Sequence, residues 1–140
     1  MPHVPAIRVH SLREARIALA VARDLDRPVT LVSAAGAAGH AGAGWWRALV
    51  ETARKEYPDV AMTTILDCGD SAGDALACLR EGVERIAFRG RADVAAKLRE
   101  IAAQTSTAMV DALPDGLDLR ALRDKPAACR VWLRAEPGDA

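Results

Sequence analysis

The chain has 140 residues, of which 51% are hydrophobic and 27% are charged, and its 19 lysines and arginines balance its 19 aspartates and glutamates. This composition is typical of one globular domain, spanning residues 1–140 and large enough to bury a core, and it excludes a disordered chain. Nucleic acids and anionic membranes need a clustered positive excess, so we expect neither as a partner.

Two further features bear on the cellular location. The N-terminal residues lack the apolar core of a signal peptide, and the longest uncharged run, 28–46, is too rich in alanine and glycine to span a membrane. The three cysteines, Cys68, Cys78 and Cys129, have no CxxC spacing. Without a secretion signal, they indicate reduced thiols and a cytoplasmic location.

From the N-terminus, short β-like runs alternate with helical patterns, which is typical of parallel β/α units. We expect a first strand at 7–10 and then a helix that begins at Ser11. Ser11 and Glu14 have the spacing of a capping box, in which each side chain accepts a hydrogen bond from a free N–H group at the helix start. A second strand is expected at 29–33.

The middle of the chain continues this alternation. The run 34–44 consists of small residues and reads as a loop, and the next helix, 45–57, ends before Pro58 because the residue before a proline disfavours helix. A third strand at 60–66 and a third helix at 74–82 follow.

A fourth strand is predicted at 85–88, a fourth helix at 92–104 and a fifth strand at 107–111. The pattern then breaks. We expect a short helix at 117–123 and a last strand at 129–136, because its apolar and polar residues alternate. The fold class is therefore α/β, with five to six strands in parallel β/α units.

In folds of this class, functional groups lie in the loops at the C-terminal ends of the strands. Four loops satisfy this condition, at 33–44, 67–71, 89–91 and 111–116. They contain the candidate residues of this chain.

Two of these loops and the segment between them resemble class II, metal-dependent fructose-bisphosphate aldolases. The run 36–42 reads Gly-Ala-Ala-Gly-His-Ala-Gly after Ser33, the following helix ends in Glu-Tyr-Pro at 56–58, and the run 65–71 reads Ile-Leu-Asp-Cys-Gly-Asp-Ser. The run 86–90, Ile-Ala-Phe-Arg-Gly, stands where the family has Val-Met-Ile-Asp-Gly. The resemblance covers about residues 9–113 and implies the first half of a TIM barrel.

The chain departs from the family at the positions that hold the metal. Cys68 stands where the family has a metal-binding histidine, Ile65 replaces the earlier histidine of the same motif, and Leu113 falls near the family's glutamate. None of the three histidines is at a family ligand position: His3, His10 and His40. A catalytic zinc needs about three converging protein ligands. We therefore expect no metal, no cofactor and no metal-dependent aldolase activity.

Each candidate residue has a functional and a structural interpretation. The resemblance implies that Asp67 is the catalytic acid/base, but a carboxylate there can also cap a loop or helix. Cys68 is a candidate nucleophile or redox thiol, or a buried inert thiol. Ser33 and Gly36 are candidates for phosphate binding, because the family serine contacts phosphate and glycine loops expose N–H groups, although such a loop can also form only a tight turn. The run 89–91 could bind an anion or be a solvated loop.

A closed barrel needs eight strands, so this chain is expected to be a truncated (half) TIM-barrel-like domain or an open α/β sandwich. Sheet edges must be covered or paired, which favours a homo-oligomer, with 131–133 as the covering segment. The leading hypothesis is a non-catalytic aldolase-like remnant that binds a partner or a phosphorylated metabolite. The alternatives are a metal-independent, lyase-like enzyme that uses Asp67, and a half-enzyme completed by a second chain.

Overall fold

The computed structural model describes residues 4–135, in which six parallel strands form one sheet in the order β5-β4-β3-β2-β1-β6. The strands are β1 (Ala6–Arg8), β2 (Val29–Val32), β3 (Met62–Asp67), β4 (Arg85–Ala87), β5 (Ala108–Val110) and β6 (Gly116–Asp118). The helices are α1 (Leu12–Leu25), α2 (Ala37–His40), α3 (Ala43–Glu56), α4 (Ala72–Glu81), α5 (Ala92–Ala102) and α6 (Lys125–Arg134). The α/β class and the strand number agree with the sequence prediction.

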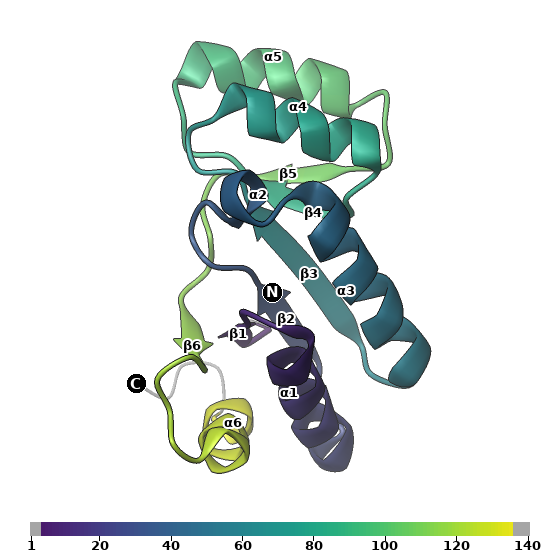
Figure 1. Ribbon diagram of the computed structural model, residues 1–140, viewed down its shortest axis with the longest axis vertical. Helices are drawn as coiled ribbons and strands as arrows, with labels where there is room; N and C mark the ends of the chain where they lie inside the picture. The colour runs from purple at the N-terminus through teal and green to yellow at the C-terminus, as the bar shows by residue number, and fades with distance from the viewer. Residues whose placement is uncertain (1–3, 136–140) are drawn as a thin grey trace.

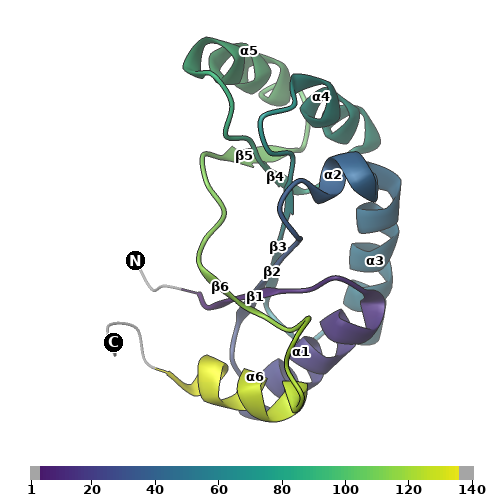
Figure 2. The same cartoon turned by 60° about the vertical axis from the view of Figure 1, so that its left-hand side comes forward.

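Strands β1 to β5 lie side by side in chain order, and at least one helix separates each pair along the chain (Figure 1). Parallel neighbours need such a crossover because each strand must return to the same end of the sheet. Helices α1, α3, α4 and α5 follow one face of the curved sheet, while the link from β5 to β6 runs along the other side (Figure 2). We call the helix-covered face the outer face and the opposite one the inner face. Helices on a single face give a partial, TIM-barrel-like sheet.

The C-terminal unit attaches at the other edge of the sheet. Strand β6 pairs with β1 and not with β5, so that Gly116 lies opposite Ala6. A Cβ atom on Gly116 would lie 3.1 Å from the carbonyl oxygen of Ala6, so a glycine suits this approach. Helix α6 lies beside α1 (Figures 1 and 2). In a closed barrel the last strand pairs with the first, and here β6 pairs with β1 in the same way. The sheet is not closed, because β5 and β6 lie at its two opposite edges.

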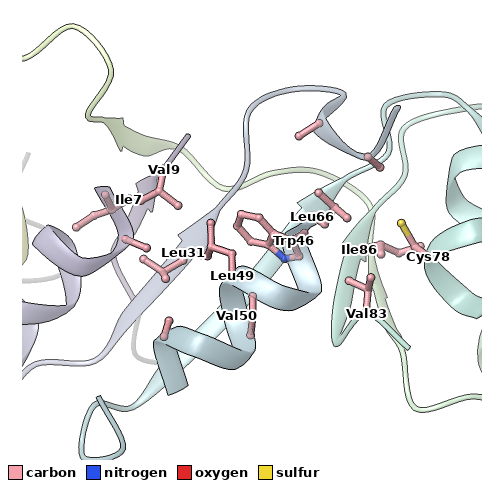
Figure 3. Close-up of a cluster of buried hydrophobic side chains, with 14 of the residues drawn as sticks. Ile7, Val9, Leu31, Trp46, Leu49, Val50, Leu66, Cys78, Val83 and Ile86 are labelled. Atoms are coloured by element: carbon pink, nitrogen blue, oxygen red, sulfur yellow. The ribbon is translucent and has the colours of Figure 1, made fainter. Parts of the chain in front are cut away.

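The apolar core has two parts, one on each face of the sheet. The larger part lies under the helices and includes Leu31, Leu66, Ile86 and the fully buried Trp46 (Figure 3). The smaller part lies on the inner face and consists of Ala6, Val32, Ile65 and Ala87, with Val110 and Leu113 packed against them. These four residues are at most 5% exposed. The link between β5 and β6 therefore covers part of the inner apolar face within the same chain.

Helix α1 begins as its sequence predicts. The hydroxyl of Ser11 accepts a hydrogen bond of 3.1 Å from the N–H of Glu14. The Glu14 carboxylate accepts one of 2.8 Å from the N–H of His10, one residue before the expected partner. The reciprocal pair satisfies two backbone donors at the helix start and fixes the turn from β1 into α1.

The two predictions for the C-terminal region were wrong. The expected helix at 117–123 begins instead as strand β6, because pairing with β1 outweighs the local pattern. The expected strand at 129–136 is helix α6 as far as Arg134, and residue 136 lies outside the described residues. Asp124 caps this helix by accepting the N–H of Ala127 at 3.0 Å. Cys129 and Leu133 are buried four residues apart, and Val131 between them is exposed, which is the period of a helix. The alternation of apolar and polar residues in this segment is a coincidence.

The predicted loop 34–44 also contains more structure than expected. Residues 37–40 form the short helix α2, and α3 begins at Ala43. Within residues 4–135, no helix is both long enough and apolar enough to cross a membrane.

Candidate functional site

The C-terminal ends of β2, β3 and β4 bring together three polar side chains. Ser33 follows β2, Asp67 is the last residue of β3, and Arg89 comes two residues after β4. Because the three strands are parallel and adjacent, their ends meet at one edge of the sheet. The sequence predicted that the loops carrying these residues would lie at the C-terminal ends of strands.

Asp67 is the centre of this group. It is 0% exposed, and its Oδ2 atom accepts two hydrogen bonds of 2.7 Å, one from the backbone N–H of Gly36 and one from the guanidinium of Arg89. The side chain of Arg89 is 45% exposed, so the ion pair joins a buried carboxylate to a cation at the surface. The other carboxylate oxygen, Oδ1, is buried without a hydrogen-bond partner among the described residues.

Ser33 holds the backbone of this site. Its hydroxyl accepts a hydrogen bond of 2.9 Å from the N–H of Asp67 and donates one of 2.8 Å to the carbonyl of Ala34. Ser33 is 0% exposed. Gly36 has φ 68°, a left-handed conformation that glycine adopts without strain, and this conformation accompanies an N–H group directed at Asp67. The donors expected to bind a phosphate at Ser33 and Gly36 are therefore engaged within the chain.

Cys68 lies next to Asp67 in the sequence but on the opposite face, since successive residues of a strand alternate. Its Sγ atom is 3.6 Å from the Sγ of Cys78 in α4, and both side chains lie in the core under the helices. The contact with Cys78 and burial raise the pKa of the Cys68 thiol well above its ordinary value. This environment is that of a buried thiol and not of an activated nucleophile.

The residues at the strand ends do not fit a catalytic metal. Asp67 and Cys68 project from opposite faces of β3, and the Asp67 carboxylate already faces the positive charge of Arg89. Ile65 belongs to the inner apolar cluster, which Leu113 covers. Among residues 4–135, there is no group of three or more histidine, cysteine or acidic side chains that could hold a metal ion. No reaction step through a metal can be derived for this arrangement.

The remaining histidines lie elsewhere. His10 forms a hydrogen bond of 2.8 Å with Asp118 of β6, and His40 is exposed at the end of α2. His3 lies outside the described residues. Ser71, after the strand-end motif, caps α4 by accepting a hydrogen bond of 3.1 Å from the N–H of Asp74.

The pairing of Arg89 with Asp67 was missed by the sequence interpretation, which gave the run 89–91 a solvated or anion-binding role. The signal was present, because an acidic and a basic residue stand at the C-terminal ends of two successive predicted strands. Periodicity does not reveal which of Arg89 and Arg91 turns inward. Arg91 instead pairs with Asp93 at the surface, at 2.9 Å.

A separate cleft of about 410 Å³ lies between α3 and the segment 82–84 that precedes β4. Trp46 and Thr64 contribute to its wall, and their buried Nε1 and Oγ1 atoms have no hydrogen-bond partner among the described residues. Arg54 and Glu84 form an ion pair of 2.6 Å at the same cleft. This cleft is on the helix side of the sheet, opposite the face that carries Asp67.

Comparison with known proteins identifies similar sequences among aldolases. The chain is 31% identical over 87 residues to a plasmid-encoded fructose-bisphosphate aldolase of Cupriavidus necator, a match that covers 62% of this chain and 25% of the relative. It is 26% identical over 94 residues to the fructose-bisphosphate aldolase of a Nostoc species and 28% identical over 94 residues to the class 2 enzyme of a Synechocystis species, and each match covers 67% of this chain and 26% of the relative.

These three relatives support the resemblance to class II fructose-bisphosphate aldolases that the strand-end motifs indicated. The matched region spans about a quarter of the length of each relative. No protein-family model matches the chain.

Proposed function

We propose that the chain is an aldolase-like module without metal-dependent aldolase activity, which acts by binding: to copies of itself, to a partner, or to a metabolite. The observation that carries this proposal is the state of Asp67. Its carboxylate is 0% exposed and is held by Arg89 and by the N–H of Gly36. A catalytic acid/base must reach the proton that it transfers, and an ion-paired, buried carboxylate does not reach a substrate.

The residues around Asp67 support the same proposal. Class II aldolases use a metal to polarise the ketose carbonyl, and Cys68, at a family ligand position, faces Cys78 instead. Where the family has an aspartate, Arg89 brings a positive charge against the Asp67 carboxylate. A divalent cation placed near this pair would be repelled by the guanidinium, so the chain offers a poor environment for the family's Lewis acid.

An aldol cleavage assay tests the loss of activity. The purified chain is incubated with fructose 1,6-bisphosphate in the presence of Zn²⁺ and, separately, of a chelator, beside an intact class II aldolase as a positive control. We expect no metal-dependent triose phosphate release from the chain. Cleavage that requires Zn²⁺ and disappears with the chelator would refute the proposal.

A second candidate function is a metal-independent, lyase-like reaction on a small phosphorylated or carbonyl substrate. The unpartnered Oδ1 atom of Asp67 favours it, because a free carboxylate oxygen can accept a proton. Such an enzyme would use Asp67 with Ser33 once the strand-end loops open, because Cys68 lies on the opposite face of β3. An Asp67→Asn variant that lost turnover while keeping its fold, as seen by circular dichroism, would favour this candidate over the binding module.

The binding role requires a partner, and we propose first a second copy of the chain. The formal charge of zero removes long-range repulsion between copies, and the outer edges of β5 and β6 have no strand paired to them within the described sheet. A second chain with the missing barrel half is the other candidate. A cytoplasmic location is proposed from the three free thiols.

Native mass spectrometry distinguishes these partners. We expect a dimer or a larger assembly of the chain by itself. A monomer at micromolar concentration would refute self-association. A mass shift with added fructose 1,6-bisphosphate would identify the metabolite-binding role. Such binding would have to displace Asp67 from Gly36 and Arg89, because those donors are engaged.

A further inference from the structure

The contact between Cys68 and Cys78 has no role in the proposed binding function. The two Sγ atoms are 3.6 Å apart, and both residues are free cysteines. A disulfide bond has an S–S length of about 2.05 Å, so the sulfurs need to approach by roughly 1.5 Å.

The positions of the two residues suit such a bond. Cys68 follows the last residue of β3, and its N–H is fixed by a hydrogen bond of 2.8 Å to the carbonyl of Ala87. Cys78 lies in α4, well inside the helix. The intervening segment contains Gly69 at φ 57° and the cap Ser71, and it closes a short loop. The two thiols are thus presented by elements that already hold them in contact.

We propose that Cys68 and Cys78 are an oxidation site, which a small peroxide converts into an intramolecular disulfide. The deprotonated sulfur of one cysteine attacks a peroxide oxygen: an S–O bond forms, the O–O bond breaks, and the departing hydroxide takes a proton to become water. The sulfur of the second cysteine then attacks the sulfenic acid: the S–S bond forms, the S–O bond breaks, and a second water leaves. Two thiols and one peroxide give one disulfide and two waters.

A small oxidant is required because the pair is buried. Cys68 is 2% and Cys78 is 0% exposed, so reagents as large as glutathione disulfide are excluded unless the chain opens locally. The thiolate is the reactive species, and the hydrogen bond between the two sulfurs raises the pKa of Cys68 and lowers the pKa of Cys78, so Cys78 supplies the attacking thiolate. The reaction therefore accelerates as the pH rises and a larger fraction of Cys78 is ionised.

The bond would fasten α4 to the strand end that positions Asp67. Because Cys68 and Asp67 point to opposite faces of β3, the bridge forms without breaking the ion pair between Asp67 and Arg89. Oxidation therefore stiffens the candidate site and leaves its charges in place. A disulfide that closes a loop of this length raises the thermal midpoint by roughly 5 °C in a chain of this size.

Peptide mapping tests the proposal on the native protein. Reduced protein is treated with hydrogen peroxide, denatured, alkylated and digested with trypsin. Cleavage after Lys55 and Arg80 places both cysteines in the peptide 56–80, and Cys129 falls in the peptide 124–130. Cys129 is also fully buried but has no cysteine beside it, so it is the internal control.

We expect the peptide 56–80 to become lighter by two hydrogen atoms and to resist alkylation until a reductant is added, while the peptide 124–130 stays alkylated. Oxidation of Met62 adds an oxygen and is separated by mass. The bridge should not form in Cys78→Ser, and the rise in thermal midpoint should reverse with reductant. Full alkylation of Cys68 and Cys78 after treatment, or a bridge to Cys129, would overturn the proposal, and the wild-type map decides this by itself.

Discussion

The strand-end site and the C-terminal closure, residues 111–135, are stabilised by different interactions. The strand-end site depends on a buried carboxylate, its ion pair with Arg89 and the hydroxyl of Ser33. The C-terminal closure depends on apolar burial, with Cys129 and Leu133 of α6 packed in the core beneath the helices. Polar networks are sensitive to the loss of one partner, whereas apolar packing is sensitive to lost volume. Substitutions and pH should therefore separate the two regions.

The largest effect is expected for Leu133→Ala. Leu133 is 1% exposed, so its truncation should lower the free energy of unfolding by about 3 kcal/mol through lost burial and a cavity. Val131 is 74% exposed, and Val131→Ala should change the free energy of unfolding by less than about 0.5 kcal/mol. Urea unfolding measures both. In a strand, residues 131 and 133 would share one face, so equal losses would contradict the helix.

Alkaline pH should weaken the same region. Burial raises the pKa of Cys129 from 9.0 to about 11. The unfolded thiol therefore ionises before the folded one, so stability is complete below pH 9 and is lost as the pH rises to 11. The loss is on the order of 2 to 3 kcal/mol. Between pH 8 and pH 11, the free energy of unfolding measured with urea should fall less in Cys129→Ala than in the wild-type protein. The other groups that titrate at alkaline pH remain in this variant. An equal difference in both proteins would exclude Cys129 as the cause.

The strand-end site should respond most to Arg89→Met. The substitution leaves the 0% exposed carboxylate of Asp67 without its cation, which destabilises the fold by about 2 kcal/mol after allowance for the half-exposed arginine. The matched control is Arg91→Met, whose pair with Asp93 lies at the surface and contributes less than about 0.5 kcal/mol. If both variants unfold at the same urea concentration, Arg89 does not hold Asp67 in solution.

The two regions also differ in how far the sequence predicted them. Apart from the short helix α2, strands and helices between 7 and 111 follow local rules, such as the Ser11 cap and the alternation of β and α patterns, and these were predicted within a few residues. In the C-terminal region, β6 exists because β1 offers a free edge, and α6 depends on the cap at Asp124. Tertiary pairing decides such segments, and a periodicity over eight residues fits both strand and helix.

For the candidate site, the sequence located the residues but not their contacts. The motif at 65–71 placed Asp67 and Cys68 at a strand end, and alternation along β3 separates their directions. The pairing of Asp67 with Arg89, and of Cys68 with Cys78, depends on how the loops and α4 settle against the sheet. No spacing along the chain encodes these distances.

The smallest effect is expected for Ser33→Ala, which tests the polar network without changing its charges. The substitution removes the acceptor of the Asp67 N–H and leaves that buried donor unpaired, at a cost of about 1 to 2 kcal/mol. Ser71→Ala removes a serine hydroxyl of a different kind, the cap of α4, and should cost about 1 kcal/mol. Because Ser33, unlike Ser71, is hydrogen-bonded to Asp67, the double variant Ser33→Ala with Arg89→Met should lose less than the sum of its parts, whereas Ser71→Ala with Arg89→Met should be additive. Additivity in both pairs would mean that Ser33 and Arg89 stabilise Asp67 independently.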